Sequence, residues 1–118
     1  MKTLLLSLLV LSSVSAFAKD CGEEMSTNGI YQCEAENFKE QDDRLNDLYK
    51  KLVAKEDKVG QKKLKKAQLA WIAYRDAECT YSSDEMRDGS FEKVLMMGCL
   101  VSETTKRADE LKDYVEFR

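Results

Sequence analysis

Apolar side chains recur along this chain at intervals of three, four and seven residues, the spacing of one face of an α-helix. Between residues 30 and 55 the repeat is carried by Tyr31, Phe38, Leu45 and Leu52, each seven residues after the one before. No stretch alternates between apolar and polar residues over a useful length, which disfavours strands. The pattern therefore predicts an all-α domain.

Two further segments, residues 61–81 and 91–114, carry apolar stripes of the same kind. The chain has no proline and only five glycines, so helices can run long and glycines mark the breaks. Gly60 is expected to end the first helix in a left-handed conformation, and Ser90 is expected to cap the third. The polar residues 80–90 are expected to form a loop. Short connections between three amphipathic helices predict a small antiparallel bundle of about three helices.

The first 18 residues have the features of a secretory signal peptide. Lys2 precedes an apolar run, and Ala16-Phe17-Ala18 has the small-x-small form of a signal-peptidase site. We expect cleavage after Ala18, with Ala16 as the alternative, which leaves residues 19–118 as one domain. The apolar run is short for a membrane span of about 20 residues, and no cysteine directly follows the cut. The sequence thus predicts a periplasmic or secreted protein with no stable membrane anchor after cleavage.

Four cysteines follow the predicted cleavage site: Cys21, Cys33, Cys79 and Cys99. An even number of cysteines in a small exported domain indicates two disulfides. Three connectivities are possible, and we favour Cys21 with Cys33 and Cys79 with Cys99, because each pair brackets a reversal of the chain. Zinc is the competing use of four cysteines. The chain has no histidine and no C-x-x-C pair, so we expect no metal site.

The charge and the residue types present argue against several classes of function. The full chain has a net charge of −3, and loss of the signal peptide removes one lysine and no acid. An acidic exported chain without interleaved basic and aromatic residues is not expected to bind nucleic acid. There is no histidine to act as base for a serine nucleophile, and no glycine-rich phosphate loop occurs. We therefore expect neither an enzyme nor a cofactor.

Trp71, Arg75 and Cys79 are spaced four residues apart and share one face of the second helix. An arginine on an apolar face needs a partner, because a buried unpaired charge costs several kcal/mol. Asp42 interrupts the first apolar stripe at the level that an antiparallel hairpin would bring to Arg75. We predict an ion pair between Asp42 and Arg75 that fixes the register of the two helices. Neighbouring side chains would complete this polar clamp: Asn46, Gln68, Tyr49 and Trp71. The alternative is an exposed cleft in which Trp71 and Arg75 hold a sugar or a peptide.

Three short patterns follow one another along nearly all of residues 19–118. The first comprises Cys33 and Asp42-x-x-Leu45-Asn46-x-x-Tyr49, and the second is Ala67-Gln68-x-x-Trp71-x-x-Tyr74-Arg75-Asp76-Ala77-x-Cys79. The third comprises Gly89-Ser90, Cys99, Thr104, Arg107 and Leu111. Together they resemble the lysozyme inhibitor LprI-like family of small secreted bacterial domains, in which many members have glycine where this chain has Asp88. The resemblance implies an all-helical, disulfide-stapled exported domain and, through the family name, inhibition of lysozyme.

Residues 80–90 are the candidate surface for a partner, because this polar loop would be anchored by a disulfide between Cys79 and Cys99. An inhibitor of a muramidase must offer hydrogen-bonding groups to two catalytic carboxylates in a cleft. The residue types that can do so are Ser82, Ser83 and Arg87. The acids Asp84, Glu85 and Asp88 could pair with basic residues around a lysozyme cleft.

We therefore expect an exported binding protein that blocks the cleft of a cationic lysozyme. The alternative is a non-inhibitory module that binds the cell wall or another envelope protein. In that case the lysines clustered between residues 50 and 66 would matter more than the loop, which would be a solvated connection.

Overall fold

The computed structural model describes residues 19–118, and the predicted signal peptide lies outside the described residues. Three long helices follow one another along the chain: α1 (Thr27–Lys55), α2 (Lys58–Ser83) and α3 (Glu92–Phe117). A short 3-10 helix, η1 (Asp84–Met86), continues from the end of α2. No strand occurs among residues 19–118. The predicted all-α class with three long helices is confirmed.

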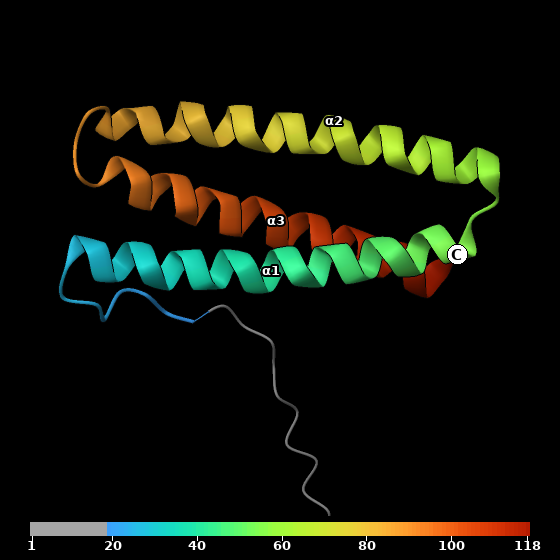
Figure 1. Ribbon diagram of the computed structural model, residues 1–118, viewed down its shortest axis with the longest axis horizontal. Coiled ribbons are helices and arrows are strands. Elements are labelled where there is room, and N and C mark those ends of the chain that lie inside the picture. Colours follow the sequence, from blue (N-terminus) through green and yellow to red (C-terminus); the bar gives the residue numbers. More distant parts are fainter. Residues whose placement is uncertain (1–18) are drawn as a thin grey trace, which may run out of the picture.

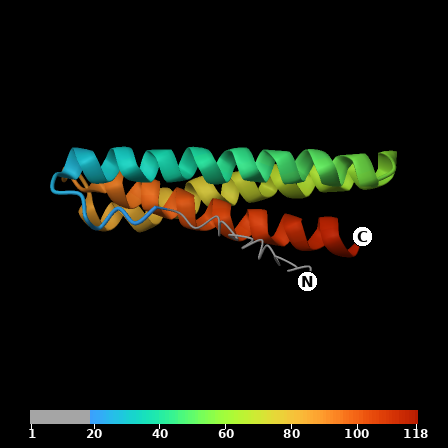
Figure 2. The same cartoon turned by 90° about the horizontal axis from the view of Figure 1, so that it is seen from below.

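The helices form an up-down-up arrangement in which α2 runs antiparallel to both α1 and α3 (Figure 1). α3 packs along both of the other helices, whereas α1 and α2 make few contacts with each other. Figures 1 and 2 agree that α1 and α3 lie side by side and point in the same direction. The two helices that are consecutive in the chain are therefore held together mainly through the third.

The core lies between the C-terminal halves of α1 and α3. Leu45 and Leu52 from α1 pack there against Ala108 and Leu111 from α3, and none of the four is more than 2% exposed. Burying one leucine side chain contributes about 1.5–3 kcal/mol. From α2, the half-buried Leu64 and Trp71 pack against the edge of this cluster. The buried residues of α2 are Gln68, Cys79 and Ser83, so no large apolar side chain of α2 is completely covered.

The first two helices begin at side-chain caps. Ser26 Oγ accepts a hydrogen bond from Gly29 N at 3.0 Å, and Asp57 Oδ1 accepts one from Gly60 N at 2.8 Å. The break between α1 and α2 is therefore at Glu56 and Asp57, which are both extended. Gly60 lies in the first turn of α2 and has no positive φ. The expectation that Gly60 ends the first helix in a left-handed conformation was wrong, because the aspartate cap starts α2 two residues before it.

The turn before α3 also differs from the prediction. No side chain caps α3, so the expected cap by Ser90 was wrong. The turn is closed instead by Asp88, whose φ is 60° and whose backbone N donates to Glu92 Oε2 at 3.0 Å. A left-handed conformation favours glycine, because a Cβ atom crowds the following carbonyl. Asp88 therefore occupies a position whose backbone conformation favours glycine.

Both disulfides have the favoured pairing. Cys21 is joined to Cys33 and Cys79 to Cys99, with Cα–Cα distances of 5.7 and 5.4 Å. The first bond ties the segment before α1 to that helix. Asn37 reinforces the attachment, since its Oδ1 accepts from Lys19 N at 2.9 Å and its Nδ2 donates to Lys19 O at 2.7 Å. The second bond joins α2 to α3 near the turn between them.

Replacing Cys79 and Cys99 together by serine is expected to lower the free energy of unfolding by about 3 kcal/mol, because the bond closes a loop with a sequence separation of 20 residues. The same change at Cys21 and Cys33, 12 residues apart, is expected to cost nearly as much, since the loop-closure entropy grows only with the logarithm of loop length. Urea denaturation of the oxidised proteins measures both effects. A loss below about 1 kcal/mol would contradict the prediction.

Candidate functional site

The surface expected to meet a partner lies where α2 turns into α3. α2 continues to Ser83, so Ser82 and Ser83 are helical rather than part of a loop. No glycine or proline occurs between residues 61 and 88 to end the helix earlier. Ser83 is fully buried, and its hydroxyl donates to the Thr80 carbonyl at 3.2 Å. The expectation that Ser83 faces a partner was therefore wrong, whereas Ser82 is exposed.

Asp84 and Arg87 pair with each other within the turn. Arg87 Nε donates to Asp84 Oδ1 at 2.7 Å, and a second guanidinium nitrogen contacts the other carboxylate oxygen. This hydrogen-bonded guanidinium lowers the pKa of the Asp84 carboxyl below its ordinary value. Asp84 therefore stays ionised at neutral and mildly acidic pH. The guanidinium of Arg87 is occupied by this internal pair, and Asp88 serves the turn through its left-handed backbone.

Tyr81 is the residue at this end that sequence reasoning missed. It is 78% exposed and lines a shallow pocket of about 400 Å³ with Ser82, Asp84 and Glu85. We call these four residues the tip. The periodicity could have identified Tyr81, because it lies two residues beyond the inward-facing Cys79 and so points to the opposite side of α2.

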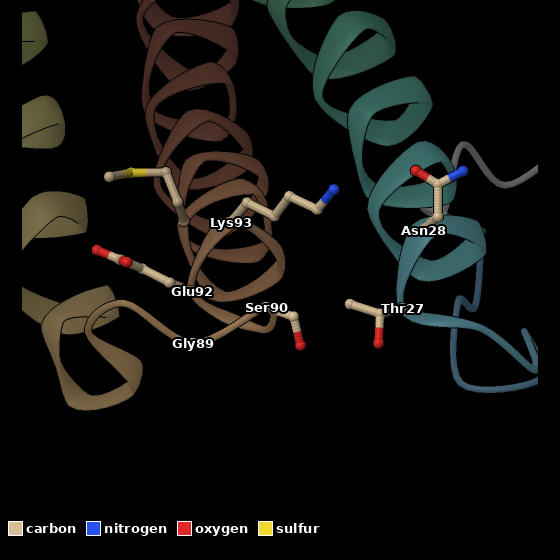
Figure 3. A pocket seen from close by; sticks show the side chains of 7 residues that line it. Thr27, Asn28, Gly89, Ser90, Glu92 and Lys93 are labelled. Carbon is tan, nitrogen blue, oxygen red and sulfur yellow. The ribbon is translucent and has the colours of Figure 1, made fainter.

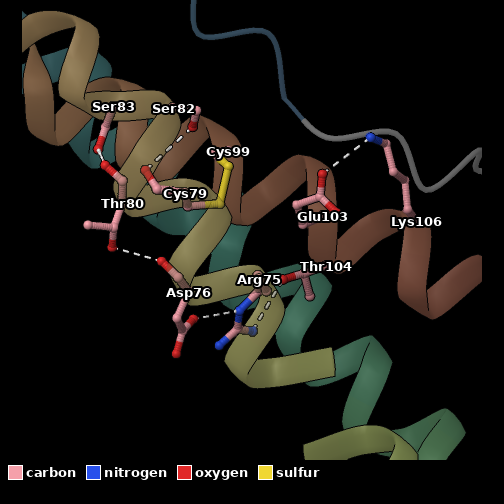
Figure 4. The surroundings of a disulfide bond; sticks show 10 residues. All are labelled: Arg75, Asp76, Cys79, Thr80, Ser82, Ser83, Cys99, Glu103, Thr104 and Lys106. Carbon is pink, nitrogen blue, oxygen red and sulfur yellow. Dashed lines mark hydrogen bonds and ion pairs between the residues drawn. A yellow bond between two sulfur atoms is a disulfide. The ribbon is translucent and has the colours of Figure 1, made fainter. Parts of the chain in front are cut away.

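The Cys79–Cys99 bond fixes the base of the tip, as Figure 4 shows. Cys79 is completely buried. The hydroxyl of Thr80 donates to the Asp76 carbonyl at 2.8 Å, which adds a further bond along the last turns of α2. The tip is thus exposed but built on a covalently braced helix end, so little conformational entropy would be lost when a partner binds it.

A cleft of about 630 Å³ lies beside the tip, where α1 and α3 both begin. It is lined by Thr27, Asn28, Gly89, Ser90, Glu92, Lys93 and Met96. In Figure 3 the side chain of Lys93 extends from α3 toward α1, and its Nζ lies 4.7 Å from the centroid of the Tyr31 ring. The cleft gives this end of the bundle a concave surface that a side chain of a partner could enter.

Charged side chains are divided unevenly between the two ends of the bundle. When each helix is split at its middle, the half that contains both disulfides comprises residues 19–41 and 71–104, with 13 acidic and five basic residues. The other half comprises residues 42–70 and 105–118, with nine acidic and 13 basic residues. We call these halves the acidic end and the lysine end. The tip and the cleft both belong to the acidic end.

The predicted ion pair between Asp42 and Arg75 is wrong. Arg75 Nε instead donates to Asp76 Oδ1 at 2.9 Å, and another guanidinium nitrogen lies 3.5 Å from the Thr104 hydroxyl (Figure 4). The guanidinium carbon lies 5.0 Å from the centroid of the Trp71 ring and 5.6 Å from that of Phe38. Arg75 therefore contacts all three helices. The hairpin argument failed because α1 packs on α3 rather than directly on α2.

The other members of the predicted clamp line a cavity between α1 and α2. Asp42, Asn46, Gln68, Trp71 and Arg75 all contribute to its wall, and its volume is about 270 Å³. Asn46 Nδ2 lies 3.4 Å from Asp42 Oδ2 on the α1 side. The structure thus places these five residues around a space rather than in a closed hydrogen-bonded network.

Comparison with known proteins places the chain in a family. The family model for lysozyme inhibitor LprI matches residues 18–111. The chain belongs to the LprI family. It is also 35% identical to an uncharacterized protein of Rhizobium meliloti (strain 1021), over an alignment of 128 positions that covers 94% of this chain and 92% of the relative. No solved structure matches.

The residues that carry the LprI resemblance meet in the folded chain. From the first pattern, Asp42, Leu45, Asn46 and Tyr49 line the α1 side of the 270 Å³ cavity. From the second pattern, Gln68, Trp71 and Arg75 line its α2 side. From the third pattern, the Thr104 hydroxyl accepts a hydrogen bond from Arg75, and Arg107 donates one to Gln68 Oε1. Residues from all three patterns therefore take part in one three-helix contact.

The described residues contain neither a metal-binding cluster nor a helix that could span a membrane. Within residues 19–118, no group of cysteine and carboxylate side chains is placed to hold a metal ion. None of the helices in the same range is long and apolar enough to cross a membrane.

Replacing Arg75 by methionine is expected to lower the free energy of unfolding by about 2 kcal/mol, because the guanidinium makes cation–π contacts with two aromatic rings and reaches Thr104. Replacing Asp42 by asparagine is expected to change it by less than about 0.5 kcal/mol, since Asp42 does not pair with Arg75. Urea denaturation of both variants measures the difference. Equal losses would indicate that the two residues act as an ion pair after all.

Proposed function

We propose that this protein is an exported inhibitor that binds a cationic lysozyme through its acidic end and blocks the cleft of the enzyme. The observation that carries the proposal is the concentration of 13 acidic residues at one end of a chain of the LprI family. The same end carries the exposed tip and the adjoining cleft.

The chemistry of the acidic end suits a basic enzyme. Opposite net charges steer two proteins together and favour the orientation in which the charged surfaces face each other. Tyr81 and Ser82 supply hydroxyl groups that can hydrogen-bond to the catalytic carboxylates of a muramidase. Asp84 and Glu85 supply charges for basic residues around the cleft. The braced base of the tip reduces the entropy lost on binding.

Export is supported by independent features. The first 18 residues have the pattern of a signal peptide, and all four cysteines after it are joined in disulfides. Disulfides persist in oxidising compartments such as the periplasm and the extracellular space. A periplasmic or secreted inhibitor would be located where lysozyme reaches the cell wall.

Replacing Glu85 by lysine is expected to raise the concentration needed for half-inhibition by a factor of about five, because the change puts a like charge opposite a basic surface. The measurement is the rate at which lysozyme clears a suspension of bacterial cells in the presence of the purified oxidised domain. The matched control is Asp113→Lys, which makes the same change of net charge on an exposed residue of the lysine end. The control is expected to inhibit as well as the parent.

Two results would count against this proposal. Absence of any slowing at micromolar domain with several lysozyme types would remove the inhibitory function. Equal weakening by Glu85→Lys and Asp113→Lys would retain inhibition but remove the acidic end as the binding surface, since only the net charge would then matter.

The lysine end supports the alternative function, a module that binds anionic cell-wall material. Eight lysines lie between residues 50 and 66, where α1 ends and α2 begins. The triple variant Lys62→Gln, Lys63→Gln, Lys66→Gln is expected to bind isolated cell walls about tenfold more weakly if this function applies, because three charges are removed. Co-sedimentation at low and high salt measures the effect. Unchanged binding in this assay would exclude the lysine end as the attachment surface.

A further inference from the structure

The cavity between α1 and α2 is not used by the function proposed above. It has a volume of about 270 Å³ and lies away from the tip, at the middle of the bundle. Its lining from α1 is Asp42, Leu45, Asn46 and Tyr49. Its lining from α2 is Lys65, Gln68, Leu69, Trp71, Ile72 and Arg75. Polar groups and apolar side chains thus face the same small space from two walls.

Gln68 has a hydrogen-bond donor that is free to face this cavity. Gln68 is only 8% exposed, and its Oε1 accepts from Arg107 Nε at 3.0 Å. A guanidinium can only donate, so the amide oxygen must face Arg107 and the NH₂ group must face away from it. Gln68 Nε2 has no hydrogen-bond partner among residues 19–118. In the same range, every side-chain nitrogen or oxygen that is completely covered does have a partner. Nε2 therefore borders accessible space, and the space that Gln68 lines is the cavity.

The orientation of Gln68 is held from outside the cavity. Arg107 also donates to Glu110 Oε2 at 2.9 Å, and the side chain of Arg107 is only 11% exposed. The guanidinium is thereby fixed between the amide and the carboxylate. The donor on the α2 wall is thus positioned before any ligand arrives, which lowers the cost of binding.

Asp42 supplies an acceptor on the opposite wall. No lysine or arginine nitrogen among the described residues lies within 4.0 Å of its carboxylate, although Arg75 lines the same cavity. Its nearest polar contact is Asn46 Nδ2, at 3.4 Å. A half-buried carboxylate with one weak hydrogen bond retains unused acceptor capacity. The two walls therefore present a donor and an acceptor to the same ligand.

Apolar and aromatic groups form the rest of the lining. Leu45, Tyr49, Trp71 and Ile72 are buried or half-buried there. A group that both accepts from Gln68 and donates to Asp42 is a hydroxyl, and a ligand that also contacts aromatic and aliphatic side chains needs C–H surface. A sugar ring has both features. The lining carries charges of both signs, from Asp42, Lys65 and Arg75, so it does not require a ligand with a net charge.

We propose that this cavity binds a single neutral pyranose ring, with its hydroxyl groups between Gln68 Nε2 and the Asp42 carboxylate and its C–H face on Trp71 and Tyr49. The volume is slightly below the range of about 300–1,000 Å³ typical of ligand pockets, which suits one ring rather than an oligosaccharide. Binding is non-covalent and does not depend on lysozyme. For a ligand of this size the dissociation constant is expected to be about 1 mM.

Trp71 reports on the site because it is the only tryptophan of the chain. Titration of the oxidised protein with N-acetylglucosamine and with methyl glucoside is expected to change its fluorescence saturably. Added sugar is also expected to shift the NMR signals of the Gln68 side-chain amide. Glycerol, which has hydroxyls but no ring, serves as the control ligand.

Two variants test the walls separately. Asp42→Ala is expected to weaken sugar binding about tenfold, whereas the matched control Asp43→Ala is not, because Asp43 pairs with Lys39 on the surface at 2.7 Å. Gln68→Glu keeps an oxygen for Arg107 but removes the NH₂ donor, so it is expected to stay folded and to bind the sugars more weakly. Both Asp42 and Gln68 lie far along the helices from the tip, so lysozyme inhibition is expected to be unchanged in these variants.

The outcomes separate this proposal from the inhibitory function. Absence of saturable fluorescence and of amide shifts well above millimolar sugar would overturn the pyranose site. Equal binding by the parent and both cavity variants, or an equal response to glycerol, would overturn it as well. None of these results bears on inhibition through the acidic end.

Discussion

The packing of α3 against both other helices is the contact on which the rest of the structure depends. Ala108 and Leu111 have no exposed surface, and they bring α3 against Leu45 and Leu52 of α1. α1 and α2 are joined by only two residues, yet they touch little except through α3. Because α3 takes the central place, the space between α1 and α2 is left open as a small cavity with both polar and apolar lining.

Arg75 illustrates how the three helices are joined at the edge of that core. Its guanidinium lies over Phe38 from α1 and Trp71 from α2, and it reaches Thr104 from α3. The charge itself is balanced at the surface by Asp76. Aromatic faces can accommodate a guanidinium without a buried carboxylate, so the cation does not require Asp42. Asp42 is thereby available to the cavity, and the stretch around Trp71 is chiefly a structural junction.

The topology also converts the order of charges along the chain into a polarity of the whole molecule. The acidic first half of α1 and the end of α2 lie at the same end of the bundle, and the turn between α1 and α2, which lysines flank in the sequence, lies at the other end (Figure 1). Neither segment alone would produce a strongly polarised surface. The polarity concerns association with other molecules rather than the fold, since exposed charges contribute little to stability.

Features that depend on local spacing were predictable from the sequence. The number and type of helices follow from the apolar repeat, and the disulfide pairs follow from chain reversals that bring nearby cysteines together. Helix ends were predicted less well. The Asp57 cap starts α2 before Gly60, and the left-handed Asp88, rather than a Ser90 cap, closes the turn before α3.

The sequence by itself determined the helical class and the residues that identify the family, and it favoured the disulfide pairs that the structure contains. Only the tertiary structure decided that α1 packs on α3, that Arg75 stacks on aromatic rings, and that Ser83 is buried whereas Tyr81 is exposed. The physical reason is the distance along the chain between the residues that interact. Helix formation and short disulfide loops depend on neighbours along the chain, whereas the partner of a side chain depends on interhelical distances of a few ångströms that no spacing in the sequence encodes.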